Sequence, residues 1–245
     1  MASNGLWGDA DAPVPEPVKR ECQVRRLVRG WRLDLAQREA GDDAALLAIV
    51  TAARAQTMEL PIGLRPTVVR TLDALFALHA AAATLSADTT PMFVGVDCEF
   101  YRNTDNRQAL STVQLAFPTA VYVVVLAVPG FRETGVGADA GAVLQVLLDR
   151  TDVRVCGYQI AQDVDVLSRA FPGLLSPDRL ERIVDVAMEC QNLGLAAACK
   201  TYLGSGLDKS LSSSDWRSEL SARQEEYAAL DAEATRRLAC VRLSV

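Results

Sequence analysis

The chain has 245 residues and a mass of 26.4 kDa, which suffices for one substantial core with a small appendage and excludes a large multidomain assembly. Half of the residues are hydrophobic and 23% are charged, a composition that excludes an intrinsically disordered protein. The formal net charge of −6 ordinarily disfavours an anionic partner, but a site built from carboxylates adds negative charge of its own, and bound cations invert the local field.

The cysteines and the apolar runs bear on the compartment. Six cysteines are scattered without a CxxC pair or the close spacing of a zinc site or disulfide framework, so reduced thiols are expected. The first residues carry acids and prolines in place of a targeting signal. The longest apolar runs fall below the roughly 18 residues that a membrane span needs. We therefore expect an intracellular protein, nuclear or cytoplasmic, that is not embedded in a membrane.

The first part of the chain predicts a tail followed by a helix. Residues 1–17 are expected to be disordered, because three prolines interrupt a stretch of small and acidic residues. After this tail, apolar residues recur at the spacing of one helical stripe: Val24, Leu27, Val28, Trp31 and Leu35.

The same stretch is strongly basic. Between residues 19 and 38, seven basic residues stand against two acidic ones, a net charge of +5. Arg25, Arg29 and Arg32 fall at i, i+4 and i+7, which predicts one positive ridge on the helix. Two interpretations stay open: a solvated face, or a ridge that contacts the phosphates of a single-stranded nucleic acid.

Two alanine-rich segments, 43–55 and 66–83, continue the helical pattern. The second places several larger residues on one side: Val68, Leu72, Leu75, Phe76 and His79. His79 is the only histidine, and on an apolar face we interpret it as a packed residue without a chemical role. Residues 18–90 are therefore predicted to form a helical N-terminal extension.

The pattern changes at Pro91, where a second domain, residues 91–245, is predicted. MFVGVDCEF is typical of a buried strand, and STVQLAF and VYVVVLAV predict a hairpin. A helix over 138–150, the strands VRVCG and IVDVAM, and further helices follow, over 163–171, 195–203 and 222–243. This order predicts an α/β domain with a mixed sheet.

Three acidic residues follow or end predicted strands of this domain. Asp97 and Glu99 lie two apart on one strand, so the pleat points both carboxylates to the same side. Asp163 follows a strand and a turn, in the first turn of a helix. Each has a plain structural explanation, a solvated strand end for the pair and a favourable helix dipole for Asp163.

The last predicted helix adds Tyr227 and Asp231, which share one face at i and i+4. Alone, this pair is typical of any amphipathic helix. Together, D-x-E on the first strand, D after the turn G-x-x-I-x-x-D, and Y-x-x-x-D on the last helix are similar in order and spacing to the DEDD exonucleases. The resemblance covers about residues 91–240 and is to the tyrosine-bearing branch, which includes ribonuclease D and Werner-type exonuclease domains. It extends to the stretch GLDKSLSSSDWRSELSARQEEYAALDAEA.

The resemblance implies an RNase H-like fold with a five-stranded mixed sheet flanked by helices. It also implies two divalent metal ions, Mg²⁺ or Mn²⁺, which prefer hard oxygen ligands. Asp97 would bridge both ions, Glu99 and Asp231 would complete the site of the first, and Asp163 would hold the second. Tyr227 would orient the attacking water. The histidine-bearing branch has its catalytic residue five positions before the last aspartate, where this chain has Glu226.

The implied function is hydrolysis of phosphodiester bonds from the 3′ end of a single-stranded nucleic acid, DNA or RNA, by a two-metal mechanism. Two alternatives remain. In the first, the chain would be a catalytically inactive member of the same fold that binds nucleic acid or acts as an adaptor. In the second, it would be an interaction protein whose residues match the exonuclease pattern by chance. One departure from the family pattern concerns Tyr158 and Gln159, which stand where a His-Asn pair is often found.

Overall fold

The structure, a computed structural model, describes residues 15–61, 63–86, 91–127 and 136–244. The chain forms two compact units, one comprising Met1–Thr57 with Asp208–Ser210, and the other Met58–Leu207 with Leu211–Val245. Most of the predicted N-terminal tail lies outside the described residues. Over the described ranges, no helix is both long and apolar enough to cross a membrane.

Over its described residues, the first unit contains three helices, α1 (Glu16–Arg29), α2 (Leu33–Ala40) and α3 (Ala44–Arg54). Their shared core is small and apolar, with Val24, Ala36, Ala40, Leu46 and Val50 buried. Two side chains hydrogen-bond the backbone groups that are left unpaired at helix ends. The Asp43 carboxylate accepts from the first backbone N–H groups of α3. The guanidinium of Arg20 donates to the last carbonyls of α2.

The predicted stripe from Val24 to Leu35 does not lie on one helix. The first helix ends at Arg29, Gly30 follows as its C-cap, and Trp31 has a φ of 56°. Gly30 is a weak helix former, and the left-handed backbone at Trp31 turns the chain before α2 begins. Arg32 consequently lies at the N-cap of α2, off the helix that carries Arg25 and Arg29.

The second unit is built on a six-stranded sheet with the order β1-β4-β3-β2-β5-β6. Its strands are β1 (Pro66–Val69), β2 (Met92–Arg102), β3 (Gln108–Ala116), β4 (Val121–Val125), β5 (Val153–Gly157) and β6 (Ile183–Asp185). The pairs β2–β3 and β3–β4 are antiparallel, whereas β1–β4, β2–β5 and β5–β6 are parallel. The mixed α/β, RNase H-like class is confirmed, with one strand more than the five expected.

The additional strand lies in a segment that was predicted to be helical. β1 pairs with β4, because the β-branched residues Thr67, Val68 and Val69 favour an extended edge strand. The helix α4 (Leu72–Thr84) begins only after the Thr71 cap. Its buried side therefore differs from the predicted one: Leu75, Leu78 and Ala82 are buried, Leu72 and Phe76 are exposed, and His79 is partly buried.

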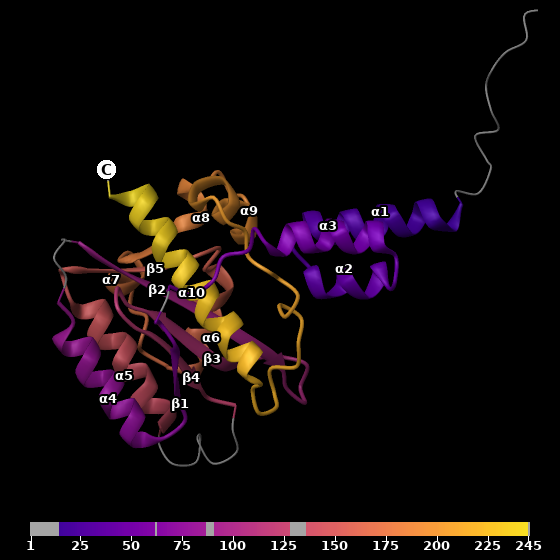
Figure 1. Cartoon of the computed structure of the whole chain (residues 1–245). Coiled ribbons are helices and arrows are strands. Elements are labelled where there is room, and N and C mark those ends of the chain that lie inside the picture. Colours follow the sequence, from indigo (N-terminus) through magenta and orange to yellow (C-terminus); the bar gives the residue numbers. More distant parts are fainter. Residues whose placement is uncertain (1–14, 62, 87–90, 128–135, 245) are drawn as a thin grey trace, which may run out of the picture. The chain divides into compact units, whose positions relative to one another are not determined.

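Helices cover both faces of the sheet (Figure 1). One face packs against α4, α5 (Val136–Asp149) and α6 (Ala161–Ala170), and this is the larger core. The other face packs against α10 (Ala222–Leu243), whose side toward the sheet is rich in alanine. In Figure 1, α4 and α5 run side by side, and α10 lies on the other side of the strands.

The remaining elements connect β5, β6 and α10. They are α7 (Pro177–Leu180), α8 (Val186–Glu189), α9 (Leu195–Ala198) and the π-helical turn η1 (Cys199–Leu203). The predicted strand IVDVAM is a strand only as far as Asp185, whose carboxylate then accepts from the Ala187 N–H and begins α8. The predicted hairpin is confirmed as β3 and β4.

Candidate active site

The central strand β2 supplies the first two acids. Asp97 and Glu99 lie on the face of the sheet that α10 covers, while the intervening Cys98 is buried in the opposite core. Their strand partners on β3 are Gln114 and Thr112, respectively. The pleat therefore presents two carboxylates toward α10, as the D-x-E spacing predicts.

The helix α10 supplies the third acid. A capping box between Ser221 and Gln224 fixes where the helix starts. Ala228 and Ala232, both fully buried, let the helix lie close to the sheet. This approach brings Asp231, which is 3% exposed, to the two carboxylates of β2.

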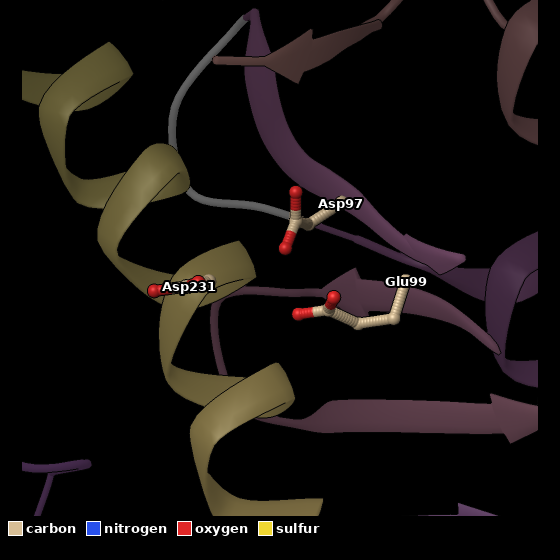
Figure 2. Close-up of side chains that lie close together, drawn as sticks. All are labelled: Asp97, Glu99 and Asp231. Atoms are coloured by element: carbon tan, nitrogen blue, oxygen red, sulfur yellow. The ribbon is translucent and has the colours of Figure 1, made fainter. Parts of the chain in front are cut away.

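The three acids converge. One carboxylate oxygen from each of Asp97, Glu99 and Asp231 lies within 4.8 Å of the others, and Figure 2 shows the three side chains pointing toward one another from β2 and α10. Like charges at this separation repel unless a cation lies between them. Oxygen ligands of this type suit a hard divalent cation such as Mg²⁺ or Mn²⁺, so the donor set fits the metal that the resemblance implies.

Tyr227 lies beside this cluster. It is 8% exposed, its hydroxyl is hydrogen-bonded to Asp231, and its ring centroid lies 6.1 Å from that of Trp216. Burial, and then the negative charge of Asp231 and of the β2 acids, raise the pKa of the phenol well above its ordinary value. The hydroxyl is therefore protonated at any ordinary pH and is available as a neutral hydrogen-bonding group.

Asp163 approaches β2 from the opposite layer. β5 pairs with β2 only as far as Gly95, and beyond that point the first turn of α6 covers the edge of β2. There the carboxylate of Asp163 accepts hydrogen bonds from the thiol and the backbone N–H of Cys98. Burial raises its pKa to about 7 despite these bonds. Asp163 thus contacts Cys98, the residue between Asp97 and Glu99, and does not belong to the group whose oxygens lie within 4.8 Å of one another.

The turn before Asp163 contains the two residues that depart from the family pattern. The ring of Tyr158 is buried, and its hydroxyl donates to the carbonyl of Leu193 at 2.6 Å. Gln159 has a φ of 53°, and its backbone N–H donates to Asp185 at 2.9 Å. Both residues thus have a structural part in holding the turn that positions Asp163.

The predicted basic ridge lies in the helical unit. Arg25 and Arg29 are exposed on α1, and Arg25 pairs with Glu21 at 2.7 Å. Arg32, beyond the helix end, is partly buried. Their contact with nucleic acid stays a prediction.

Two residues beside the cluster were not singled out from the sequence. Trp216 packs on Tyr227, and Gln114 lies across from Asp97 in the sheet. One signal was available for Gln114, because it is a large polar residue in the middle of the apolar strand STVQLAF. For Trp216 no spacing rule links it to the acids.

A mixed sheet whose central strand carries converging carboxylates, completed by an acid from a covering helix, defines an RNase H-like fold with a candidate metal site. The amino-acid sequence leads to a family that agrees with this fold and site. The chain belongs to the 3′-5′ exonuclease family, whose model matches residues 69–240, a range that includes β2, α6 and most of α10. Members of this family generally use divalent metals. A search of curated proteins gave no match.

Solved structures share this fold. The Nibbler EXO domain of Aedes aegypti superposes with a TM-score of 0.62 at 20% identity, over 77% of this chain and 91% of that one. For Escherichia coli RNase D, the TM-score is 0.56 at 23% identity, over 74% of this chain and 46% of that one. For Trypanosoma brucei RNase D in complex with RNA U12, the TM-score is 0.57 at 17% identity, over 80% of this chain and 66% of that one. The chain thus spans about half the length of the Escherichia coli enzyme.

Proposed function

We propose that this chain is an active, metal-dependent 3′→5′ exonuclease of the tyrosine-bearing branch, which releases mononucleotides from the 3′ end of a nucleic acid strand. The observation that carries this proposal is the convergence of Asp97, Glu99 and Asp231 beside a buried, protonated Tyr227 in a chain of the exonuclease family. All four acids and the tyrosine of the family pattern are present, which favours an active enzyme over an inactive binding member.

Each residue has a distinct role in this proposal. Asp97, Glu99 and Asp231 would hold one divalent ion, and Asp97 with Asp163 would hold the second. Bound divalent ions would supply the positive charge that activates water and stabilises the departing 3′ oxygen. The hydroxyl of Tyr227 would orient the attacking water, because it is protonated and hydrogen-bonded to Asp231.

Asp163 must lose a proton before it can act as a ligand. Burial raises its pKa to about 7, so a large share of the metal-free protein carries a neutral carboxyl at this position near neutral pH. Carboxylates bind metal in their ionised form, and metal binding accordingly releases protons. Activity is therefore expected to fall as the pH decreases below 7.

The substrate is proposed to be a single strand of RNA or DNA. One structural neighbour holds RNA U12, which makes RNA the first substrate to test. Discrimination between the two would depend on contacts to the 2′-hydroxyl.

The decisive experiment uses matched RNA and DNA strands labelled at the 3′ end, incubated with the full chain in Mg²⁺, in Mn²⁺ and in EDTA. We expect labelled mononucleotide as the first product with metal and none with EDTA. Asp97→Asn serves as the control for a contaminating nuclease, since it keeps the shape of the side chain and removes its charge. A strand that is bound but not shortened in either metal would favour the inactive binding member instead.

A further inference from the structure

A buried amide lies beneath the carboxylate cluster. Gln114 on β3 is fully buried, and its Nε2 donates to the hydroxyl of Thr112 at 2.5 Å. Its Oε1 has no hydrogen-bond partner in the part of the chain that the structure describes. Buried polar atoms in proteins are almost always hydrogen-bonded, and leaving one unpaired costs free energy. The side chain therefore requires a further polar neighbour.

Strand register shows which neighbour that is. On β4, the residue across from Gln114 is Val123, which is apolar. On β2, the residue across from it is Asp97. Directly opposed residues of an antiparallel pair share a face, with Cβ atoms about 4.5–5.5 Å apart. The covering stretch of α10 contributes alanines, Tyr227 and Asp231. Asp97 is thus the polar side chain that the strand register places directly across from the amide.

A carboxylate needs a donor, and the amide can provide one. A threonine hydroxyl both donates and accepts, so it can serve either end of the amide. Rotating the amide by half a turn lets Oε1 accept from Thr112 and directs the two N–H groups away from that hydroxyl. In this orientation the buried acceptor is satisfied, and a donor becomes available for Asp97.

We propose that Gln114, held by Thr112, is a positioning residue for the metal-binding carboxylates, donating a hydrogen bond from its amide to Asp97. This inference rests on the proposed function. Residues that hydrogen-bond metal ligands fix their orientation, and losing them typically weakens metal binding or activity about 10- to 100-fold.

A neutral amide suits this position. Lysine or arginine there would also donate to Asp97, but its positive charge would compete with the cation for the same carboxylate. Glutamate would add a fourth negative charge to the cluster and could not donate when ionised. Because Thr112 lies across from Glu99, the same amide–hydroxyl pair extends beneath both acids of β2.

The test measures Mn²⁺ binding to the metal-free full chain by electron paramagnetic resonance, without substrate, together with urea unfolding. The variants are Gln114→Met, which keeps the volume and removes both polar atoms, and Thr112→Val, which removes only the hydroxyl. Val113→Ala is the matched control, since Val113 is the intervening residue on β3 and is buried in the opposite core. It should lower stability without touching the cluster.

We expect Gln114→Met to weaken Mn²⁺ binding about 10-fold or more, Thr112→Val to weaken it by a smaller factor, and Val113→Ala to leave it within about twofold. Should Gln114→Met fail to fold, Thr112→Val decides alone. Wild-type affinity in the folded Gln114 and Thr112 variants would overturn this inference and leave the proposed function intact. A wild-type chain that binds no Mn²⁺ and releases no nucleotides would instead overturn both.

Discussion

Gly95 on β2 lies directly against the carbonyl oxygen of Ala232 on α10, so closely that a Cβ atom on this glycine would approach that oxygen to 2.1 Å. Gly95 is two residues before Asp97 on the same face of the strand, and Ala232 follows Asp231. The contact therefore sets the distance between the strand and the helix at the point where their carboxylates meet. A side chain at this position is excluded by backbone, which cannot rotate away.

Gly95→Ala is accordingly expected to displace α10 from β2 and to separate Asp231 from Asp97. We expect a loss of about 1–3 kcal/mol in the free energy of unfolding, typical of overpacking, together with weaker metal binding. Urea unfolding and Mn²⁺ titration measure the two effects. Gly194→Ala is the control, because a Cβ there meets nothing within 4 Å. Equal stability of both variants would show that α10 can shift at no cost.

Removal of a clustered acid should abolish activity and leave the fold intact. Asp231→Ala and Asp97→Ala each remove one of three like charges whose oxygens lie within 4.8 Å. Repulsion between the remaining pair is lower, so we expect the metal-free variants to unfold at the same or a higher urea concentration. Turnover should decrease at least about 100-fold in Mg²⁺. Near-wild-type turnover in either variant would contradict the two-metal mechanism.

Tyr227→Phe should lower kcat more than it changes KM. The phenol is assigned to the attacking water, and the ring, packed on Trp216, survives the substitution. A decrease of about 100-fold in kcat is expected from the loss of an orienting group. Tyr122→Phe is the matched control, because Tyr122 packs against the core on the opposite face of the sheet. An unchanged kcat with a raised KM would reassign Tyr227 to substrate binding.

The raised pKa of Asp163 predicts how the stability of the metal-free protein depends on pH. The ordinary value is 3.8, and burial raises the pKa in the folded protein to about 7. Between these values the folded state holds a proton that the unfolded chain has released, so this residue's contribution to the free energy of unfolding decreases as the pH rises and is lost above about 7.

Asp163→Asn removes this titration. Unfolding in urea with EDTA, from pH 4.5 to 8, should show the variant gaining stability relative to the wild type as the pH rises from 4.5 to about 7, with no further gain above that pH. A difference between the two proteins that stays constant over this range would indicate that Asp163 ionises freely in the folded state.

Local patterns allowed prediction of the sheet and of the face on which Asp97 and Glu99 lie, because strand alternation is a short-range property. They did not allow prediction of β1, since four residues are too few for periodicity to distinguish a strand from the helix that follows. The break at Gly30 was also missed, because the apolar spacing continues across it into α2. One turn of irregular backbone at Trp31 preserves that spacing while ending the helix.

The surroundings of the site depend on contacts between distant residues. The partnership of Gln114 with Asp97 follows from the register of β2 on β3, and that register includes a shift between Glu99 and Phe100. The placement of Asp163 beside Cys98 depends on where β5 stops pairing with β2. Neither can be read from spacing along the chain, since each is fixed by tertiary packing.

The last prediction concerns the arginines of the helical unit. Arg25 and Arg29 are exposed on α1, and the ion pair of Arg25 with Glu21 is largely exposed to solvent, so it contributes little and a phosphate can compete for the guanidinium. Arg32 lies beyond the end of α1, which separates it from Arg25 and Arg29. If the ridge contacts a single strand, each lost phosphate contact should flatten the slope of log affinity against log salt by about 0.7. The Arg25→Gln, Arg29→Gln double variant should therefore reduce the slope by about 1.4. Adding Arg32→Gln should bring the total reduction to at most about 2. Fluorescence anisotropy of a labelled strand, with EDTA to prevent hydrolysis, measures the slope. Arg38→Gln, an exposed arginine on α2, is the control and should leave the slope nearly unchanged. An unchanged slope in the folded triple variant would assign these arginines to a solvated surface.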